Sequence, residues 1–188
     1  RWANDDVLHS VTNYELDTKV LYSGHNDHNF EIAHTIRREF DENGGIYKGR
    51  TLYSFADNHD VDRLASKLNN KAHMFPEYTL LYTLPGIPSI YYGSEWGIEG
   101  RKEGGNDDPL RPALNLAEME EKYKDCQLTE HIRMLGRLKK SFHRSPKENT
   151  EITSDQSTVA FARIQDDKAV IVAVNNDENP ATRFHSGA

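Results

Sequence analysis

The sequence predicts an α/β fold, built from parallel strands with crossover helices, that is followed by a piece of antiparallel sheet. Short apolar runs with strand character alternate with amphipathic helical runs over most of the chain, and this alternation is typical of parallel sheets. From about residue 150, TVAFARI, QDD and KAVIVAVN form a strand, a tight turn and a strand, which indicates a hairpin. We place a domain boundary near 145–150, with residues 1–149 in one domain and 150–188 in the next.

Three strands are expected in the α/β part. They cover residues 8–13, 51–56 and 87–93. The first strand ends in the polar pair Asn13-Tyr14, and the second ends in FADNHD, whose last three side chains can all form hydrogen bonds. The third, IPSIYYG, leads into a loop rich in glycine and charge that runs from 94 to about 115.

Three helices are expected between and after these strands. They cover 30–43, a stretch that includes 77–84, and 128–144. The apolar stripe of the first helix consists of Phe30, Ala33, Ile36 and Phe40. Gly44-Gly45 is expected to end this helix as a C-terminal cap, and the second helix stops before Pro85. The inward residues of the third are Ile132, Leu135, Leu138 and Phe142.

Composition excludes several classes of partner and location. The 188 residues carry 30 acidic and 23 basic side chains, a net charge of -7, which argues against nucleic acid or an anionic membrane as partner. The single Cys126 excludes an internal disulfide. The start RWANDD is no signal peptide, and the apolar runs are too short to cross a bilayer. We expect a soluble cytoplasmic protein.

The stretch FADNHD lies where a parallel α/β sheet normally places its active site, beyond the carboxyl end of a strand. Asp57 and Asp60 are three residues apart, so they point to opposite faces and do not form a catalytic carboxylate pair. Asp60, at the tip, is the freer of the two to meet a ligand. The alternative is that Asp60 or Asp62 caps the turn VDRLASKL that follows.

Several motifs, in order along the chain, resemble one enzyme family. YSFADNHDVDRLAS is similar to the fourth conserved region of glycoside hydrolase family 13, the α-amylase family, and LLYTLPGIPSIYYGSEWGIEG resembles its last barrel strand. VLHSVTNYEL resembles the sixth strand of cyclomaltodextrinase- and neopullulanase-like members, and DDPLRPAL continues the pattern. The resemblance covers essentially the whole chain, and the combination of NHD with GIPSIYYG at this spacing is specific.

The resemblance implies part of a (β/α)8 barrel, namely its last three βα units with strands six to eight, followed by a truncated antiparallel β-domain of sandwich type. A complete barrel needs about 250 residues, whereas the fourth-region motif already comes at residue 55 of this sequence. We therefore expect the chain to be the C-terminal portion of a larger enzyme. The first five strands, which carry the family's nucleophile and acid/base, are expected to lie outside it.

The resemblance also implies a reaction and its residues. Family members cleave or transfer α-glucosidic bonds with retention of configuration, using two carboxyl groups about 5 Å apart. Asp60 matches a third carboxylate, which bonds sugar hydroxyls and stabilises the transition state, and His59 matches a substrate-binding histidine. Asp108 and Arg111 resemble a pair that grips a neighbouring sugar, although they are three residues apart, one fewer than in the family's pattern. The implied substrate is an α-glucan, a malto-oligosaccharide or a cyclodextrin.

Two positions depart from the family's pattern, and two aromatic residues have two alternative roles. Ser94 stands where Asp is usual after Tyr-Tyr-Gly, and Glu15 stands where Pro is frequent. Tyr92 and Trp96 could stack on sugars, but apolar residues of a last barrel strand usually belong to the barrel core. These differences concern structure or specificity more than the type of reaction.

Two other functions compete with that of a glycosidase. His25, His28 and His34 are close in sequence and could converge on zinc, but no fourth ligand has suitable spacing, and calcium is not indicated, so we expect no metal and no cofactor. A non-catalytic interaction or carbohydrate-binding domain could reuse the barrel fold. Such a domain is expected to lose sugar-contacting residues, whereas His59, Asp60 and Arg111 remain.

An isolated piece of barrel is expected to associate with itself. Its strands have two unpaired edges, and its barrel-inward face, with residues such as Leu52, Ser54, Ile90 or their alternates, lacks the strands that normally pack against it. We expect a two-fold dimer that does not hydrolyse starch, cyclodextrin or pullulan on its own.

Overall fold

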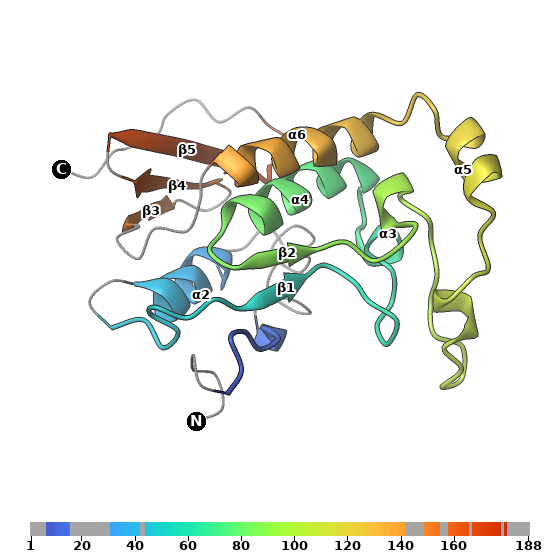
Figure 1. Cartoon of the computed structure of the whole chain (residues 1–188), viewed down its shortest axis with the longest axis horizontal. Coiled ribbons are helices and arrows are strands. Elements are labelled where there is room, and N and C mark those ends of the chain that lie inside the picture. The colour runs from blue at the N-terminus through green and yellow to red at the C-terminus, as the bar shows by residue number, and fades with distance from the viewer. Residues whose placement is uncertain are drawn as a thin grey trace.

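Two short parallel strands form the centre of the structure, a computed structural model. The structure describes residues 7–15, 31–41, 44–141, 149–154, 158–165, 167–177 and 179. The central strands are β1 (Tyr53–Phe55) and β2 (Ile87–Ser89), with Tyr53 opposite Ile87 in a parallel register. Figure 1 shows them side by side, pointing the same way, with helices α4 and α6 along one side.

A third parallel segment lies on the far side of β1 from β2. Val11 accepts a hydrogen bond from the Tyr53 amide at 2.9 Å, and the Asn13 amide donates to the Tyr53 carbonyl at 2.8 Å, around a parallel bridge at Thr12. The order is thus residues 11–13, then β1, then β2, as expected for consecutive barrel strands. The regular hydrogen-bonded stretches are shorter than the sequence predicts.

Gly86 allows β2 to approach β1 directly after a helix. The Ile87 amide donates to the Leu52 carbonyl at 2.7 Å. Gly86 has φ +119°, and a Cβ there would lie 2.8 Å from the same carbonyl oxygen. Only glycine tolerates both this backbone angle and this closeness, so the GIP sequence sets the entry into the strand.

The described residues form the helices α2 (Glu31–Phe40), α3 (Leu64–Lys67), α4 (Met74–Thr83), α5 (Leu116–Lys122) and α6 (Gln127–Ser141). Of these, α2, α4 and α6 are the three predicted helices in the predicted order, and α3 forms where only a turn was expected. α4 ends before Pro85 as predicted. α5 was not predicted, because it buries no residue and so has no apolar stripe; the Asn115 side chain caps it by accepting from the Ala117 amide at 3.1 Å. In the described part of the chain, no helix is both long and apolar enough to cross a membrane.

The end of α2 differs from the prediction. The helix stops at Phe40, and neither Gly44 nor Gly45 has the positive φ of a left-handed cap. Ile46 and Tyr47 instead fold back and donate their amides to carbonyls of the last helical turn, at 3.0 and 2.9 Å. Gly45 is needed for close approach, since a Cβ there would lie 2.6 Å from the Asp41 nitrogen. The expected cap is therefore wrong.

Two apolar clusters hold the elements together. The first contains Ala33 and Ile36 of α2, Leu80 and Leu84 from α4 and its end, Val159 and Phe161 of β4, and Val172 and Val174 of β5. The second contains Ala56, Leu64, Leu68, Tyr78, Leu81, Leu128, Ile132 and Leu135. The predicted stripes are confirmed for Ala33, Ile36 and the partly buried Phe40 of the first helix and for Ile132 and Leu135 of the last, whereas Leu138 is only partly buried and belongs to neither cluster. Phe30 and Phe142 lie outside those residues.

The two faces of the β1–β2 pair differ in exposure. Leu52 and Ser54 are buried, at 1% and 3% exposure, whereas Tyr53 is 41% and Ile87 is 40% exposed. Ala56, which shares a face with Leu52 and Ser54, packs among α3, α4 and α6. The other face carries Tyr53 and its pairing partner Ile87, both partly exposed, and also Phe55, which is buried at 2% exposure.

A three-stranded antiparallel sheet packs on the helices. Its strands are β3 (Asn149–Ser154), β4 (Thr158–Gln165) and β5 (Lys168–Asn175), in that order. The predicted hairpin is confirmed as β4–β5, and β3 adds a strand that was not separately predicted. The buried Arg163 of β4 donates to the carbonyl of Thr83, at the end of α4, at 2.9 Å. The sheet lies at the opposite end of the molecule from the loops that follow β1 and β2 (Figure 1).

Candidate active site

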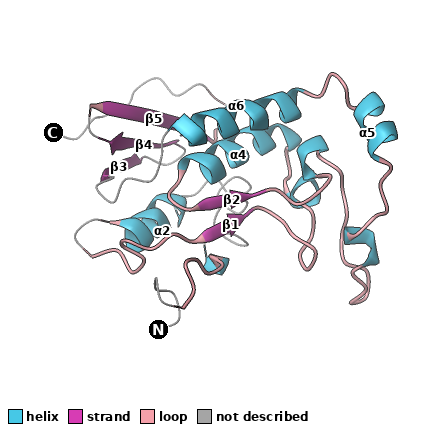
Figure 2. Cartoon of the chain, viewed as in Figure 1, coloured by secondary structure: helices cyan, strands magenta, loops and turns pink. Residues whose placement is uncertain are grey.

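The loops that follow β1 and β2, coloured pink in Figure 2, extend to the same end of the molecule. Directly after β1, the Asn58 side chain turns the chain by accepting hydrogen bonds from the amides of Asp60, at 2.8 Å, and Val61, at 3.2 Å. This turn leaves the Asp60 carboxylate on the surface, with 56% of the side chain exposed. Asn58 therefore shapes the tip that carries His59 and Asp60.

The Asp60 carboxylate lies between a guanidinium that donates to it and an imidazole. Arg111 Nη2 lies 3.2 Å from Asp60 Oδ1, and His59 Nε2 lies 3.3 Å from Asp60 Oδ2. Arg111 Nε also donates to the His59 carbonyl at 3.1 Å. Three of the four predicted site residues thus lie together, although Arg111 is about fifty positions away in sequence.

The fourth predicted residue, Asp108, is not the carboxylate that pairs with Arg111. Besides Asp60, the described carboxylate that pairs with Arg111 is Asp107, whose Oδ2 lies 2.9 Å from Arg111 Nη2 and whose Oδ1 lies 3.0 Å from Lys102 Nζ. The hydrogen bond from Lys102 lowers the pKa of Asp107. The ion pair has a spacing of four residues, which could have identified Asp107 from the sequence. A direct role of Asp108 on sugar stays a prediction.

Asp57 lies under the tip and links it to α3. Its Oδ2 accepts from the Leu64 amide at 2.8 Å, and Ser94 Oγ lies 2.9 Å from each carboxylate oxygen. Burial raises the pKa of Asp57, while these two donors act in the opposite direction. The proposed cap by Asp60 or Asp62 is wrong, because Asp57 receives the first α3 amide.

Asp62 has a different role from the predicted cap. Its Oδ1 accepts from the Lys102 amide at 2.8 Å, and its Oδ2 lies 3.4 Å from Arg101 Nη1. It therefore ties the loop that follows β2 to the start of α3.

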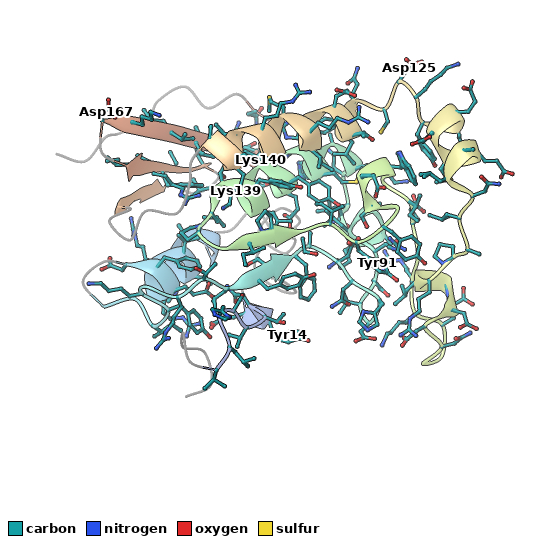
Figure 3. The ribbon with its side chains drawn as sticks, in the orientation of Figure 1. Tyr14, Tyr91, Asp125, Lys139, Lys140 and Asp167 are labelled. Atoms are coloured by element: carbon teal, nitrogen blue, oxygen red, sulfur yellow. The ribbon has the colours of Figure 1, made fainter. Side chains whose placement is uncertain are left out.

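Arg63 is the largest fully buried side chain near the site, and sequence analysis missed it. Its Nη1 donates to the Tyr92 carbonyl at 2.6 Å and to Ser94 Oγ at 3.1 Å, and its Nη2 donates to the Leu110 carbonyl at 2.7 Å. Its Cζ lies 4.2 Å from the ring centre of Tyr91, labelled in Figure 3 where the chain leaves β2. Arginine is seldom fully buried, so its sequence position gave no sign of this role.

The aromatic candidates for sugar stacking both have partners in the protein. The Tyr92 hydroxyl donates to the Pro112 carbonyl at 2.9 Å, and its ring is 43% exposed. The Trp96 ring stacks on Tyr123, at the end of α5, with centroids 5.9 Å apart and planes 14° apart. Stacking of either ring on a sugar stays a prediction.

The two departures from the family's pattern have local structural partners. Ser94 lies between Arg63 and Asp57, as described above. The Glu15 amide donates to Asn13 Oδ1 at 3.2 Å, and its carboxylate pairs with Arg38 of α2. Glu15 thus helps to hold the end of the first parallel segment against its helix.

The zinc alternative involves three histidines. His25 and His28 lie outside the described residues, and His34 is exposed on α2. Within the described ranges, no group of three or more histidine, cysteine, aspartate or glutamate side chains could hold a metal ion.

The described site is an exposed carboxylate flanked by an imidazole and a guanidinium. This combination can accept hydrogen bonds from a hydroxyl-rich ligand and donate hydrogen bonds to it.

Comparison with known proteins identifies the family. A family model described as "Alpha amylase, catalytic domain" matches residues 1–175. The chain belongs to the α-amylase family. This confirms the resemblance seen in the motifs, and it agrees with the position of the NHD tip after a parallel strand. The family match extends to the end of β5.

Named relatives fall within the expected branch of the family. The chain is 24% identical to an intracellular maltogenic amylase of Bacillus subtilis, over 93% of this chain and 29% of the relative. It is 27% identical to a cyclomaltodextrinase of a Bacillus species, over 94% of this chain and 31% of the relative. The chain thus spans about a third of the length of these curated relatives.

A solved structure shows the same fold. The cyclic α-maltosyl-(1→6)-maltose hydrolase of Arthrobacter globiformis, in its ligand-free form, superposes with a TM-score of 0.69 at 21% identity. The likeness covers 93% of this chain and 39% of that one. The α/β part is therefore a partial (β/α) barrel of the α-amylase type, and the predicted fold class is confirmed to that extent.

Proposed function

We propose that this chain forms the strand-six to strand-eight side of the active site of a retaining enzyme that acts on α-glucosidic bonds. Family membership supports a glycosidase, and the named relatives act within this reaction class. The observation that carries the proposal is the exposed Asp60 carboxylate beyond the carboxyl end of β1, held by Arg111 and His59. Its substrate is an α-glucan, a malto-oligosaccharide or a cyclodextrin.

Asp60 is the transition-state-stabilising carboxylate in this proposal. It accepts hydrogen bonds from sugar hydroxyls, and these bonds tighten as the ring flattens toward the oxocarbenium-like transition state. Interactions that strengthen only in the transition state raise the rate rather than the affinity alone. His59 donates to a hydroxyl of the same sugar.

Arg111 serves the neighbouring sugar. Its Nε and Nη2 are occupied by His59, Asp60 and Asp107, whereas Nη1 has no partner among the described residues. The guanidinium is thus fixed in a plane by three acceptors while Nη1 stays available to a ligand. Asp108 joins this subsite by accepting from a sugar hydroxyl.

The nucleophile and the acid/base are supplied, in this proposal, by barrel strands that this sequence does not include. Retaining glycosidases need two carboxyl groups at about 5 Å, and the motif resemblance assigns neither to these residues. Asp57 does not take this role, because its carboxylate is buried and bonded to Leu64 and Ser94.

The β3–β5 sheet begins a C-terminal β-sandwich domain in this proposal, with the boundary at 149/150. Val159, Phe161, Val172 and Val174 pack on the helices. The opposite face pairs Ala160 with Ala173, Ala162 with Ile171, and Ile164 with Ala169. Ile171 on that face is 79% exposed, and a sheet that is apolar on both faces is typical of one covered by a second layer.

Substitution of Asp60 in the complete enzyme tests the proposed role. Asp60→Asn is expected to lower kcat by about 10²–10³-fold with little change in Tm, because the exposed side chain packs against little. His59→Ala is expected to cost less. Asp62→Asn, two positions away, is the matched control and is expected to keep kcat. Full activity of Asp60→Asn together with a large fall in Tm would mean that Asp60 is a structural residue.

A further inference from the structure

We infer that Arg63 is a positioning residue for this site, acting on Arg111 through the Leu110 backbone and on the Asp60 tip through Ser94 and Asp57. The inference rests on the proposed function, because that function gives the site its role. The hydrogen bonds of Arg63 do not depend on that role. No sugar contact is required of Arg63, which is 0% exposed.

The guanidinium of Arg63 is fixed by acceptors on two different loops. It donates to the Tyr92 carbonyl and the Ser94 hydroxyl after β2, and to the Leu110 carbonyl almost twenty positions further along. A buried charge is tolerated only when it is well hydrogen-bonded, and charge-assisted bonds of this length are strong. The three contacts therefore hold the two loop segments at a set distance.

The contact with Leu110 reaches the site directly. The Leu110 carbonyl belongs to the peptide bond that joins Leu110 to Arg111, so fixing this oxygen fixes the start of the Arg111 side chain. The same loop is tied to α3 by the Arg63 amide, which donates to the Gly100 carbonyl at 2.9 Å, and by the Gly100 amide, which donates to Ser66 Oγ at 2.9 Å. Arg111 then bonds Asp60 and His59 from a fixed base.

Ser94 provides the second route. Its hydroxyl accepts from Arg63 Nη1 and donates to Asp57, whose carboxylate holds the Leu64 amide. A hydroxyl can accept and donate at once, so it links the buried cation to the buried carboxylate. An aspartate at position 94 would instead put a second carboxylate beside Asp57, where like charges repel. Serine at position 94, where the family usually has aspartate, therefore suits both of its neighbours, Arg63 and Asp57.

The chain contains a control for Ser94. Ser54 is equally buried, at 3% exposure, but its Oγ has no hydrogen-bond partner among the described residues. Ser94→Ala and Ser54→Ala remove the same atom from equally buried positions. Only Ser94→Ala breaks the link between Arg63 and Asp57.

The first readout needs no activity. In the 188-residue chain, the nitrogen–proton NMR correlation of the Arg111 Nε–H group reports its bond to the His59 carbonyl. Ser94→Ala and Arg63→Lys are expected to shift this signal, and Ser54→Ala is expected to leave it in place. An unchanged signal in Ser94→Ala would overturn the inference while leaving the proposed role of Asp60 untouched.

The second readout is a double-mutant cycle on kcat/KM for maltohexaose in the complete enzyme. Arg63→Lys is expected to lower kcat/KM by about tenfold or more, chiefly through KM, because small displacements of a positioned group are costly. In an Arg111→Ala background the same change is expected to cost less than about threefold, because coupled residues are not additive. Equal losses in both backgrounds would overturn the inference. Full activity of Asp60→Asn would overturn the proposed function instead.

Discussion

Arg163 joins the antiparallel sheet to the barrel part, and Arg163→Met tests how much that joint contributes to stability. The side chain is 7% exposed, and Nη1 lies 2.9 Å from the Thr83 carbonyl and 3.5 Å from the Leu84 carbonyl, at the end of α4. Lys139 of α6, labelled in Figure 3, also donates to the Leu84 carbonyl, at 2.9 Å. The substitution therefore removes the hydrogen bond that Arg163 donates to the Thr83 carbonyl, whereas the Leu84 carbonyl keeps Lys139 as a donor.

The expected magnitude follows from these contacts. A hydrogen bond from a charged donor contributes about 1.5–3 kcal/mol, and a cation at a helix C-terminus contributes about 0.3–1 kcal/mol. Methionine keeps most of the aliphatic packing, so the loss is expected to be about 2–4 kcal/mol, or about 5–15 °C in Tm for a chain of this size. Thermal unfolding followed by circular dichroism measures it.

Lys168→Met, at an exposed position of β5, is the matched control and is expected to stay within about 0.5 kcal/mol of the parent. If Arg163→Met melts at the same temperature as this control, the sheet is held by its apolar contacts alone and the assigned role of Arg163 is wrong.

Three further predictions concern pH, assembly and activity. Burial raises the pKa of Glu39 above its ordinary 4.5, so the folded state keeps this proton to higher pH and stability falls as pH rises through that interval. Asn13 Nδ2 donates to Glu39 Oε2 at 2.7 Å, and glutamine at position 39 keeps an acceptor for this donor. Glu39→Gln is therefore expected to remove the fall in stability. If the urea unfolding midpoints of the parent and of Glu39→Gln change in the same way from about pH 4 to pH 7, this prediction is contradicted. The 188-residue chain is expected to form a two-fold dimer through the face that carries Tyr53 and Ile87, and a compact monomer by light scattering at high concentration would contradict that. The same chain is expected to show no turnover of starch, cyclodextrin or pullulan, and turnover that Asp60→Asn abolishes would place the catalytic pair within it.

The order of elements could be predicted because it depends on local patterns. The stripe that includes Ala33 and Ile36 marks one helical face, and Pro85 ends α4. Strand lengths could not be predicted, because Leu52 and Ala56 are apolar and buried, like strand residues, yet lie outside the regular pairing of β1. α5 has no buried residue, so no apolar stripe indicates it, and the Asn115 cap alone was not enough to predict it.

The site could be predicted only where a motif named its residues. His59, Asp60 and Arg111 were expected from resemblance, and the structure brings them together. Arg63 could not be expected, since its acceptors, two backbone carbonyls and the Ser94 hydroxyl, come within reach only when the loops are folded. The spacing of four residues between Asp107 and Arg111 was a usable sequence signal for their ion pair, and the 3₁₀ turn at 108–110 lies between them.

The central claim is that Asp60 bonds the substrate more strongly in the transition state than in the ground state. The most direct test compares, in the complete enzyme, how Asp60→Asn weakens binding of two ligands. One is an inhibitor with a flattened, positively charged ring, and the other is the product maltose. Our account predicts that inhibitor affinity falls by about as much as kcat/KM, whereas maltose affinity falls far less. Equal weakening of both ligands would show that Asp60 only binds sugar, and would contradict the account.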